Sequence, residues 1–115
     1  MSYPLVHISN STPYGASGKV SYASIFCSDD NYSAGANGGT WTASSRGVCL
    51  VTEVSATLFV DGKPVNATPY SSSGTSYSQF AIIQIGSGFA VTRVTAAADN
   101  ADVGELLPEP TENQK

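Results

Sequence analysis

The chain has 115 residues, of which 41% are hydrophobic and 12% charged, and its net charge is −4. This length allows one domain with one core, and no apolar run approaches the ~20 residues that span a bilayer. Because that run is missing, we expect no membrane insertion, and because basic patches are absent, we expect no nucleic-acid partner and no membrane held by charge attraction.

The N-terminal half predicts two strands and a long loop. The first residues lack a basic segment followed by an apolar one, so we expect no signal peptide and a protein that is cytoplasmic or non-classically secreted. Residues 5–9 predict a short strand and residues 10–15 a loop. Residues 17–26 alternate between apolar and polar positions and predict a second strand. Residues 28–39 contain three glycines and predict a longer loop.

In the C-terminal half, apolar and polar residues continue to alternate with a period of two. Residues 48–60 predict one long strand, and Asp61-Gly62 predicts a tight hairpin turn after it. The serine-rich residues 71–76 predict a loop, and residues 79–85 and 89–95 predict two strands joined by a hairpin at 86–88. Together these segments predict an all-β fold, an antiparallel β-sandwich of six to eight short strands that is jelly-roll or immunoglobulin-like.

Residues 99–115 differ from the rest in composition. They hold five acidic residues and one lysine, so their net charge of −4 equals that of the whole chain. We therefore divide the chain into a β-sandwich domain over 1–98 and an acidic C-terminal extension over 99–115. The apolar residues 106–108 inside the extension predict an anchor that docks on the body or on a neighbouring subunit.

The body, residues 1–98, is almost free of charge. It carries four acidic and four basic residues, while the whole chain has 27 Ser and Thr residues. A surface of neutral polar groups is cheap to desolvate, and a net charge near zero favours association. This composition predicts a surface that binds another molecule, and we expect the protein to be a homo-oligomer.

The two cysteines, Cys27 and Cys49, form either one disulfide or two buried free thiols. The single histidine, His7, lies in the first predicted strand, where we interpret it as a residue bonded to backbone or water. Neither the spacing of His7 from the cysteines nor that of the carboxylates favours an activated nucleophile or an acid–base pair. We predict no catalytic residues, no metal site and no enzyme activity.

The segment Asp29, Asp30, Asn31 and Tyr32 is the main candidate for ligand binding. Its oxygen atoms allow three interpretations, which are Asx turns at a strand end, a calcium site and direct contact with a sugar. Tyr70 and Tyr77 flank the serine-rich loop and are further candidates for ligand contact, because sugar sites pair an aromatic face with polar side chains. No cofactor is expected, with calcium as the alternative.

Three other side chains are given structural roles. Trp41, the only tryptophan, is predicted to lie in the core. Arg46 is predicted to close a turn before the long strand or to anchor Asp29 or Asp30. Arg93 is predicted to pair with Glu53 if their strands are neighbours.

The function that this pattern favours is lectin-like recognition of glycans or of a cell surface by an oligomeric β-sandwich, since oligomers supply avidity to weak sugar sites. A first alternative is a self-assembling structural subunit, because the body has few lysines to protect its strand edges. A second alternative is a small membrane-active toxin that would refold through the alternating residues 78–97.

Overall fold

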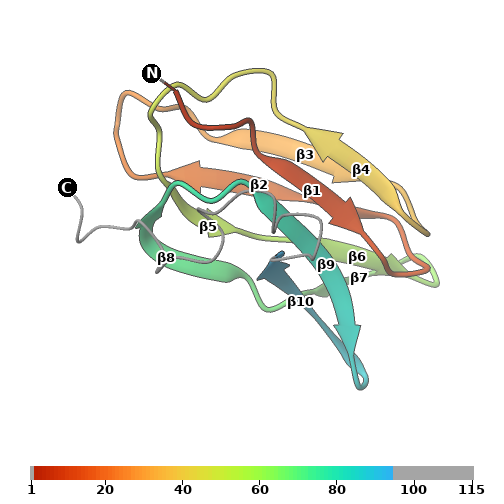
Figure 1. Ribbon diagram of the computed structural model, residues 1–115. Helices are drawn as coiled ribbons and strands as arrows, with labels where there is room; N and C mark the ends of the chain where they lie inside the picture. Colours follow the sequence, from red (N-terminus) through yellow and green to blue (C-terminus); the bar gives the residue numbers. More distant parts are fainter. Residues whose placement is uncertain (1, 95–115) are drawn as a thin grey trace.

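The computed structural model describes residues 2–94, which form ten strands in two sheets packed face to face (Figure 1). The all-β, two-layer prediction is confirmed. The number of strands exceeds the predicted six to eight. The acidic extension and its apolar anchor at 106–108 lie outside the described residues.

The first sheet, sheet A, has four strands in the order β10-β9-β1-β4. They are β1 (His7–Asn10), β4 (Gly39–Thr42), β9 (Gln79–Ile85) and β10 (Gly88–Arg93). Strands β1 and β9 run parallel, so the prediction of a purely antiparallel sandwich is wrong at this pair. The chain passes through the whole second sheet between β1 and β9, and such a long connection permits the parallel pairing that a hairpin cannot make.

The second sheet, sheet B, has six strands. They are β2 (Ala16–Tyr22), β3 (Asp30–Ala34), β5 (Val51–Val54), β6 (Thr57–Val60), β7 (Lys63–Asn66) and β8 (Tyr70–Thr75). Strands β5 and β6 lie end to end along β2 in one register, with Val20 opposite Val54 and Ala16 opposite Leu58. The segment predicted as one long strand at 48–60 is therefore two strands that run in the same direction. The first starts at Val51, and Ser55 and Ala56 separate it from the second.

Three segments differ from their predicted state. The strand predicted for 17–26 ends at Tyr22, and residues 23–28 form a loop. The loop predicted for 28–39 contains β3, and the serine-rich loop at 71–76 is largely β8. Both strands lie at an edge of sheet B, where one face meets water, so polar side chains are compatible with strand structure there.

The predicted turns are confirmed. Asp61 and Gly62 have φ angles of 53° and 80° between β6 and β7, as a type I′ hairpin turn requires. Gly86 has a φ of 60° in the turn between β9 and β10. Both hairpins lie at the same end of the sandwich, at the lower right of Figure 1.

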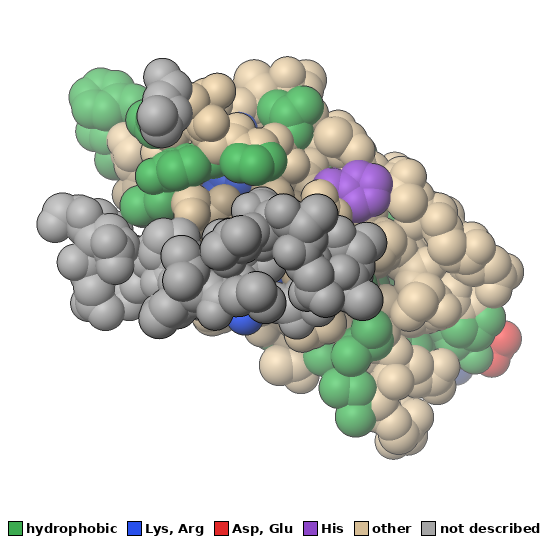
Figure 2. Space-filling view, in the orientation of Figure 1, with side chains coloured by type: hydrophobic (Ala, Val, Ile, Leu, Met, Phe, Trp, Pro, Cys, Tyr) green, Lys and Arg blue, Asp and Glu red, His purple; other side chains and the backbone are tan. Residues whose placement is uncertain are grey.

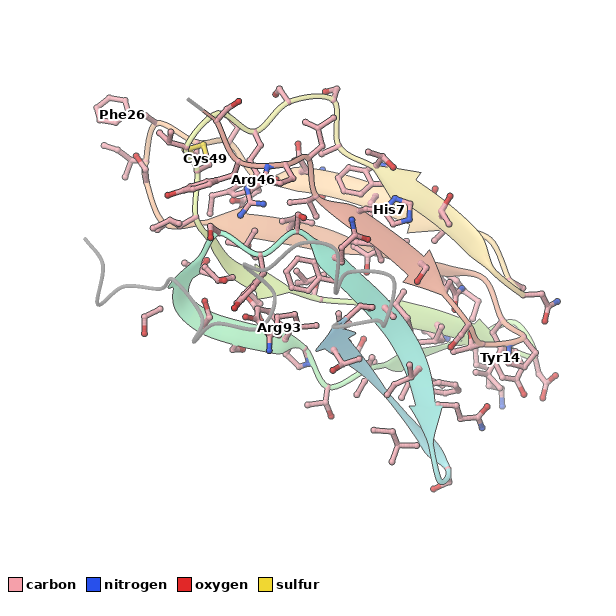
Figure 3. All side chains as sticks on the ribbon, in the orientation of Figure 1. His7, Tyr14, Phe26, Arg46, Cys49 and Arg93 are labelled. Atoms are coloured by element: carbon pink, nitrogen blue, oxygen red, sulfur yellow. A yellow bond between two sulfur atoms is a disulfide. The ribbon has the colours of Figure 1, made fainter. Side chains whose placement is uncertain are left out.

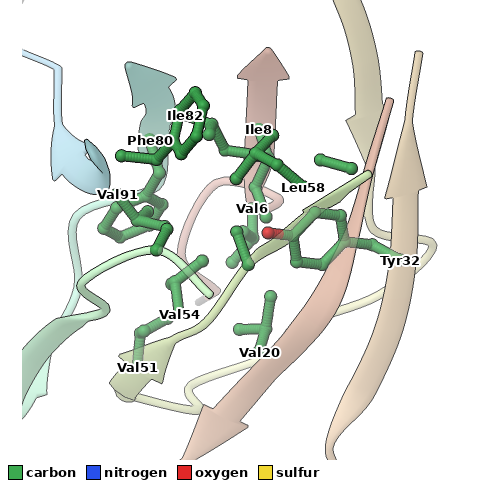
Figure 4. Close-up of a cluster of buried hydrophobic side chains, with 14 of the residues drawn as sticks. Val6, Ile8, Val20, Tyr32, Val51, Val54, Leu58, Phe80, Ile82 and Val91 are labelled. Atoms are coloured by element: carbon green, nitrogen blue, oxygen red, sulfur yellow. The ribbon is translucent and has the colours of Figure 1, made fainter. Parts of the chain in front are cut away.

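The core fills the space between the two sheets (Figure 4). Its largest fully buried apolar side chains are Val6, Ile8, Val20, Val51, Val54, Leu58, Phe80 and Ile82. Trp41 is half-buried and packs against this cluster, with its ring centroid 5.6 Å from that of Tyr32. The prediction that Trp41 lies in the core is therefore confirmed only in part.

Residues 2–94 contain no helix long and apolar enough to cross a membrane.

A buried amide fixes one corner of the sandwich. The Asn10 side chain, which has no exposed surface, donates to the carbonyls of Tyr14 at 2.7 Å and Ala34 at 3.2 Å. Its Oδ1 accepts from the backbone nitrogen of Thr12 at 3.0 Å and from the Thr12 hydroxyl at 2.7 Å. These four bonds join the loop after β1 to the end of β3, so the two sheets are held together by polar contacts as well as apolar packing.

Candidate binding site

A disulfide joins two loops at the end of the sandwich opposite the two hairpins. Cys27 lies in the loop 23–29 that follows β2, and Cys49 lies in the loop 43–50 that precedes β5. Their Cα atoms are 6.1 Å apart, and Figure 3 shows Cys49 close to Phe26 and Arg46 at this end. The cross-link brings together two stretches of chain that are separated by 22 residues.

The two loops and the adjoining ends of β2 and β3 line a cavity of about 280 Å³ that is open to solvent on one side. Its walls are the disulfide and the side chains of Tyr22, Phe26, Ser28, Asp30, Ser45 and Arg46. Hydroxyl, carboxylate and guanidinium groups thus surround one small volume, and Phe26 adds an aromatic ring that is 90% exposed.

Asp30 and Tyr22 form the polar centre of this cavity. The Tyr22 hydroxyl donates to Asp30 Oδ2 at 2.7 Å. Burial and the neighbouring carboxylate raise the pKa of Tyr22 above its ordinary value, so the hydroxyl stays protonated and remains a donor. The second carboxylate oxygen of Asp30 accepts no hydrogen bond from residues 2–94 and is free to accept one from a ligand.

Arg46 holds the second loop in place. Its guanidinium is 5% exposed and donates to the carbonyls of Cys49 at 2.9 Å, Pro4 at 3.0 Å and Thr75 at 2.8 Å, and it also lies over the Tyr3 ring. Burial lowers the pKa of Arg46 from its ordinary value. The predicted role in closing a turn is confirmed by the bond to Cys49, whereas no ion pair with Asp29 or Asp30 forms in the described chain.

Only one of the four residues of the main candidate segment lines the cavity. Asp30 lines the cavity, while Asp29 and Asn31 are exposed outside it. Tyr32 points inward, is 5% exposed, and donates its hydroxyl to the Ser55 carbonyl at 2.5 Å. Burial raises the pKa of Tyr32 above its ordinary value. Of the four side chains, the structure therefore brings only Asp30 to the cavity.

The two further tyrosines do not line this cavity. The ring of Tyr70 packs against Phe80 with centroids 4.9 Å apart. Tyr77 is 5% exposed, and its ring lies 4.1 Å from the Arg93 guanidinium carbon. The condition for the predicted Arg93–Glu53 pair is not met, because β10 and β5 belong to different sheets and are not neighbours.

The histidine and the two cysteines have structural partners. Nδ1 of His7 lies 2.8 Å from the Thr42 hydroxyl, across the β1–β4 pair, and both sulfur atoms are in the disulfide. Within residues 2–94, no three His, Cys, Asp or Glu side chains are grouped closely enough to hold a metal ion.

Sequence reasoning missed Tyr22, Phe26, Ser28 and Ser45 as cavity residues. The signal that identifies them is their position beside the two cysteines, since a bond between Cys27 and Cys49 places residues 22–30 against residues 45–49. Comparison of the chain with family models, curated proteins and solved structures found no match.

Proposed function

We propose that this protein is a non-catalytic binding module that recognises glycans through the cavity at its disulfide-linked end. The observation that carries the proposal is the Asp30 carboxylate, which lines the cavity, accepts the Tyr22 hydroxyl at one oxygen and has no partner among residues 2–94 at the other. Sugars need acceptors and donors for their hydroxyls and an aromatic face for their C–H groups. Asp30, the serine hydroxyls and the exposed Phe26 ring supply these groups.

The remaining surface supports the same proposal. A nearly uncharged body loses little hydration free energy on contact, and jelly-roll and immunoglobulin-like sandwiches commonly bind with the loops at one end. A single shallow sugar site binds weakly, so we include a homo-oligomer in the proposal because several sites together supply avidity.

Asp30→Asn is expected to lower glycan binding about tenfold, because a neutral amide is a weaker acceptor than a carboxylate while it still accepts the Tyr22 hydroxyl. A glycan array probed with the native and variant proteins measures this effect. Asp61→Asn is the matched control, since it removes the same charge at a hairpin whose φ of 53° suits asparagine. An array without any signal for the native protein, or equal signals for both variants, would contradict the proposal.

Self-assembly is the second candidate function, and the sheet edges favour it. The edge strand β7 is protected by Lys63 and Pro64, whereas the edge strand β4 consists of Gly39, Thr40, Trp41 and Thr42 and carries no charge. Light scattering over a range of concentrations separates the two functions. A glycan-binding oligomer is expected to keep a fixed mass, while an assembling subunit grows with concentration, and a monomer at every concentration contradicts both the assembly and the avidity argument.

We do not extend the proposal to a membrane-active toxin. The segment on which that alternative depended includes β9 and β10, which bury Phe80, Ile82, Phe89 and Val91. Its release would remove these four side chains from the core.

A further inference from the structure

Three large apolar side chains project from the disulfide-linked loops. Ile25 is 93% exposed, Phe26 90% and Val48 66%, and we call these three residues the apolar tip. Phe26 and Val48 directly precede the two bonded cysteines, so the cross-link holds them near each other. Figure 2 shows hydrophobic side chains gathered at the upper left end of the molecule, and Figure 3 shows Phe26 pointing away from the sheets there.

Within residues 23–28 and 43–50, which carry the apolar tip, no ionic side chain is exposed, and the nearest exposed charge along the chain is Asp29. Among residues 23–28 and 43–50 the only ionic side chain is Arg46, which is buried and bonded to three carbonyls. The other residues of these loops are small, apolar or hydroxylated. No ion among residues 23–28 and 43–50 has to lose its water when the apolar tip enters an apolar medium, so the desolvation of the tip itself is favourable.

The size and shape of the apolar tip favour a lipid surface over a protein partner. Three side chains expose an area on the order of a few hundred Å², below the ~800 Å² that each partner buries in a specific protein–protein interface. A convex apolar projection can enter the boundary between headgroups and acyl chains without any matching pocket. The exposed Asp29 at the end of the loop 23–29 disfavours an anionic surface, so the matching bilayer is electrically neutral.

The cavity and the apolar tip share Phe26. A tip seated in the lipid boundary would bring the cavity to the level of the headgroups. We propose that the apolar tip docks on a neutral lipid bilayer and that the glycan bound in the cavity is carried by a lipid. This inference rests on the proposed function for the glycan, while the contact with lipid rests on the tip alone.

The test is co-sedimentation with vesicles of phosphatidylcholine, with and without a neutral glycosphingolipid. Ile25→Ser with Val48→Ser changes the apolar tip without touching a cavity residue, and it is expected to lower vesicle binding about tenfold or more. The control, Ile85→Ser with Val65→Ser, removes the same side-chain types from exposed positions at the hairpin end and is expected to bind as the native protein does.

The outcomes separate the two proposals. The tip variant should keep its signal on a glycan array in solution, whereas Asp30→Asn should keep its binding to plain phosphatidylcholine and lose only the increase that the glycosphingolipid gives. Native protein that stays in the supernatant, or equal losses in the tip and control variants, overturns the lipid inference. A tip variant that changes oligomeric mass and not vesicle binding also overturns it, because the apolar tip is then a contact between copies.

Discussion

Gly18→Ala is expected to destabilise the folded protein by about 3 kcal/mol, because the added methyl group has no space. A Cβ atom at Gly18 would overlap the backbone carbonyl of Ser55 and would come within 2.8 Å of Cε2 of Tyr32. The carbonyl is also the acceptor of the Tyr32 hydroxyl. The substitution therefore forces the backbone at the β5–β6 break to move and displaces a buried aromatic ring.

Gly15→Ala is the matched control for this prediction. A Cβ atom at Gly15 meets nothing within 4 Å, and its φ lies outside the left-handed region, so alanine there is expected to change stability by no more than about 0.5 kcal/mol. Urea denaturation of the two variants gives the comparison. Equal midpoints would show that Ser55 and Tyr32 can relax around a methyl group, contrary to the close packing inferred here.

The same contact explains why Tyr32 is buried in β3 and does not lie in the predicted loop. A tyrosine among Asp, Asn and Ser predicts a loop, but Gly18 leaves a gap opposite Tyr32 in β2, and the aromatic ring fills it. The pairing of β2 with β3 is a contact between distant residues, and the local composition does not reveal it. Where the apolar pattern was strong, as at 79–85, the predicted strand matches β9.

The candidate site was predictable only through Asp30. Turn signals such as Asp61-Gly62 depend on adjacent residues and were found correctly. The cavity depends instead on the bond between Cys27 and Cys49, and the sequence left that bond open as one of two alternatives. Without this bond, the alternation of apolar and polar residues does not place Ser45 near Asp30. The alternation at 17–26 also predicts a strand that includes Ile25 and Phe26.

The second large effect is expected from removal of this disulfide. Replacing both Cys27 and Cys49 by serine should lower stability by about 3 kcal/mol, since the bond closes a loop across a separation of 22 residues in the unfolded chain. Thermal unfolding of the native and double-serine proteins measures the loss. Arg46 still fixes the second loop through its three carbonyl bonds, so the two sheets are expected to remain folded.

Loss of ligand binding should exceed what the change in stability explains, because the first loop carries Phe26 and Ser28 and is joined to the second through this bond. We expect the folded double-serine protein to lose glycan and vesicle binding together, whereas Asp30→Asn and the tip variant each lose only one. A thiol reductant should reproduce both losses in the native protein and have no effect on the double-serine protein. Since disulfides persist in oxidising compartments, the binding surface would then be complete only there. Unchanged binding by the double-serine protein would show that Arg46 alone is enough to build the site.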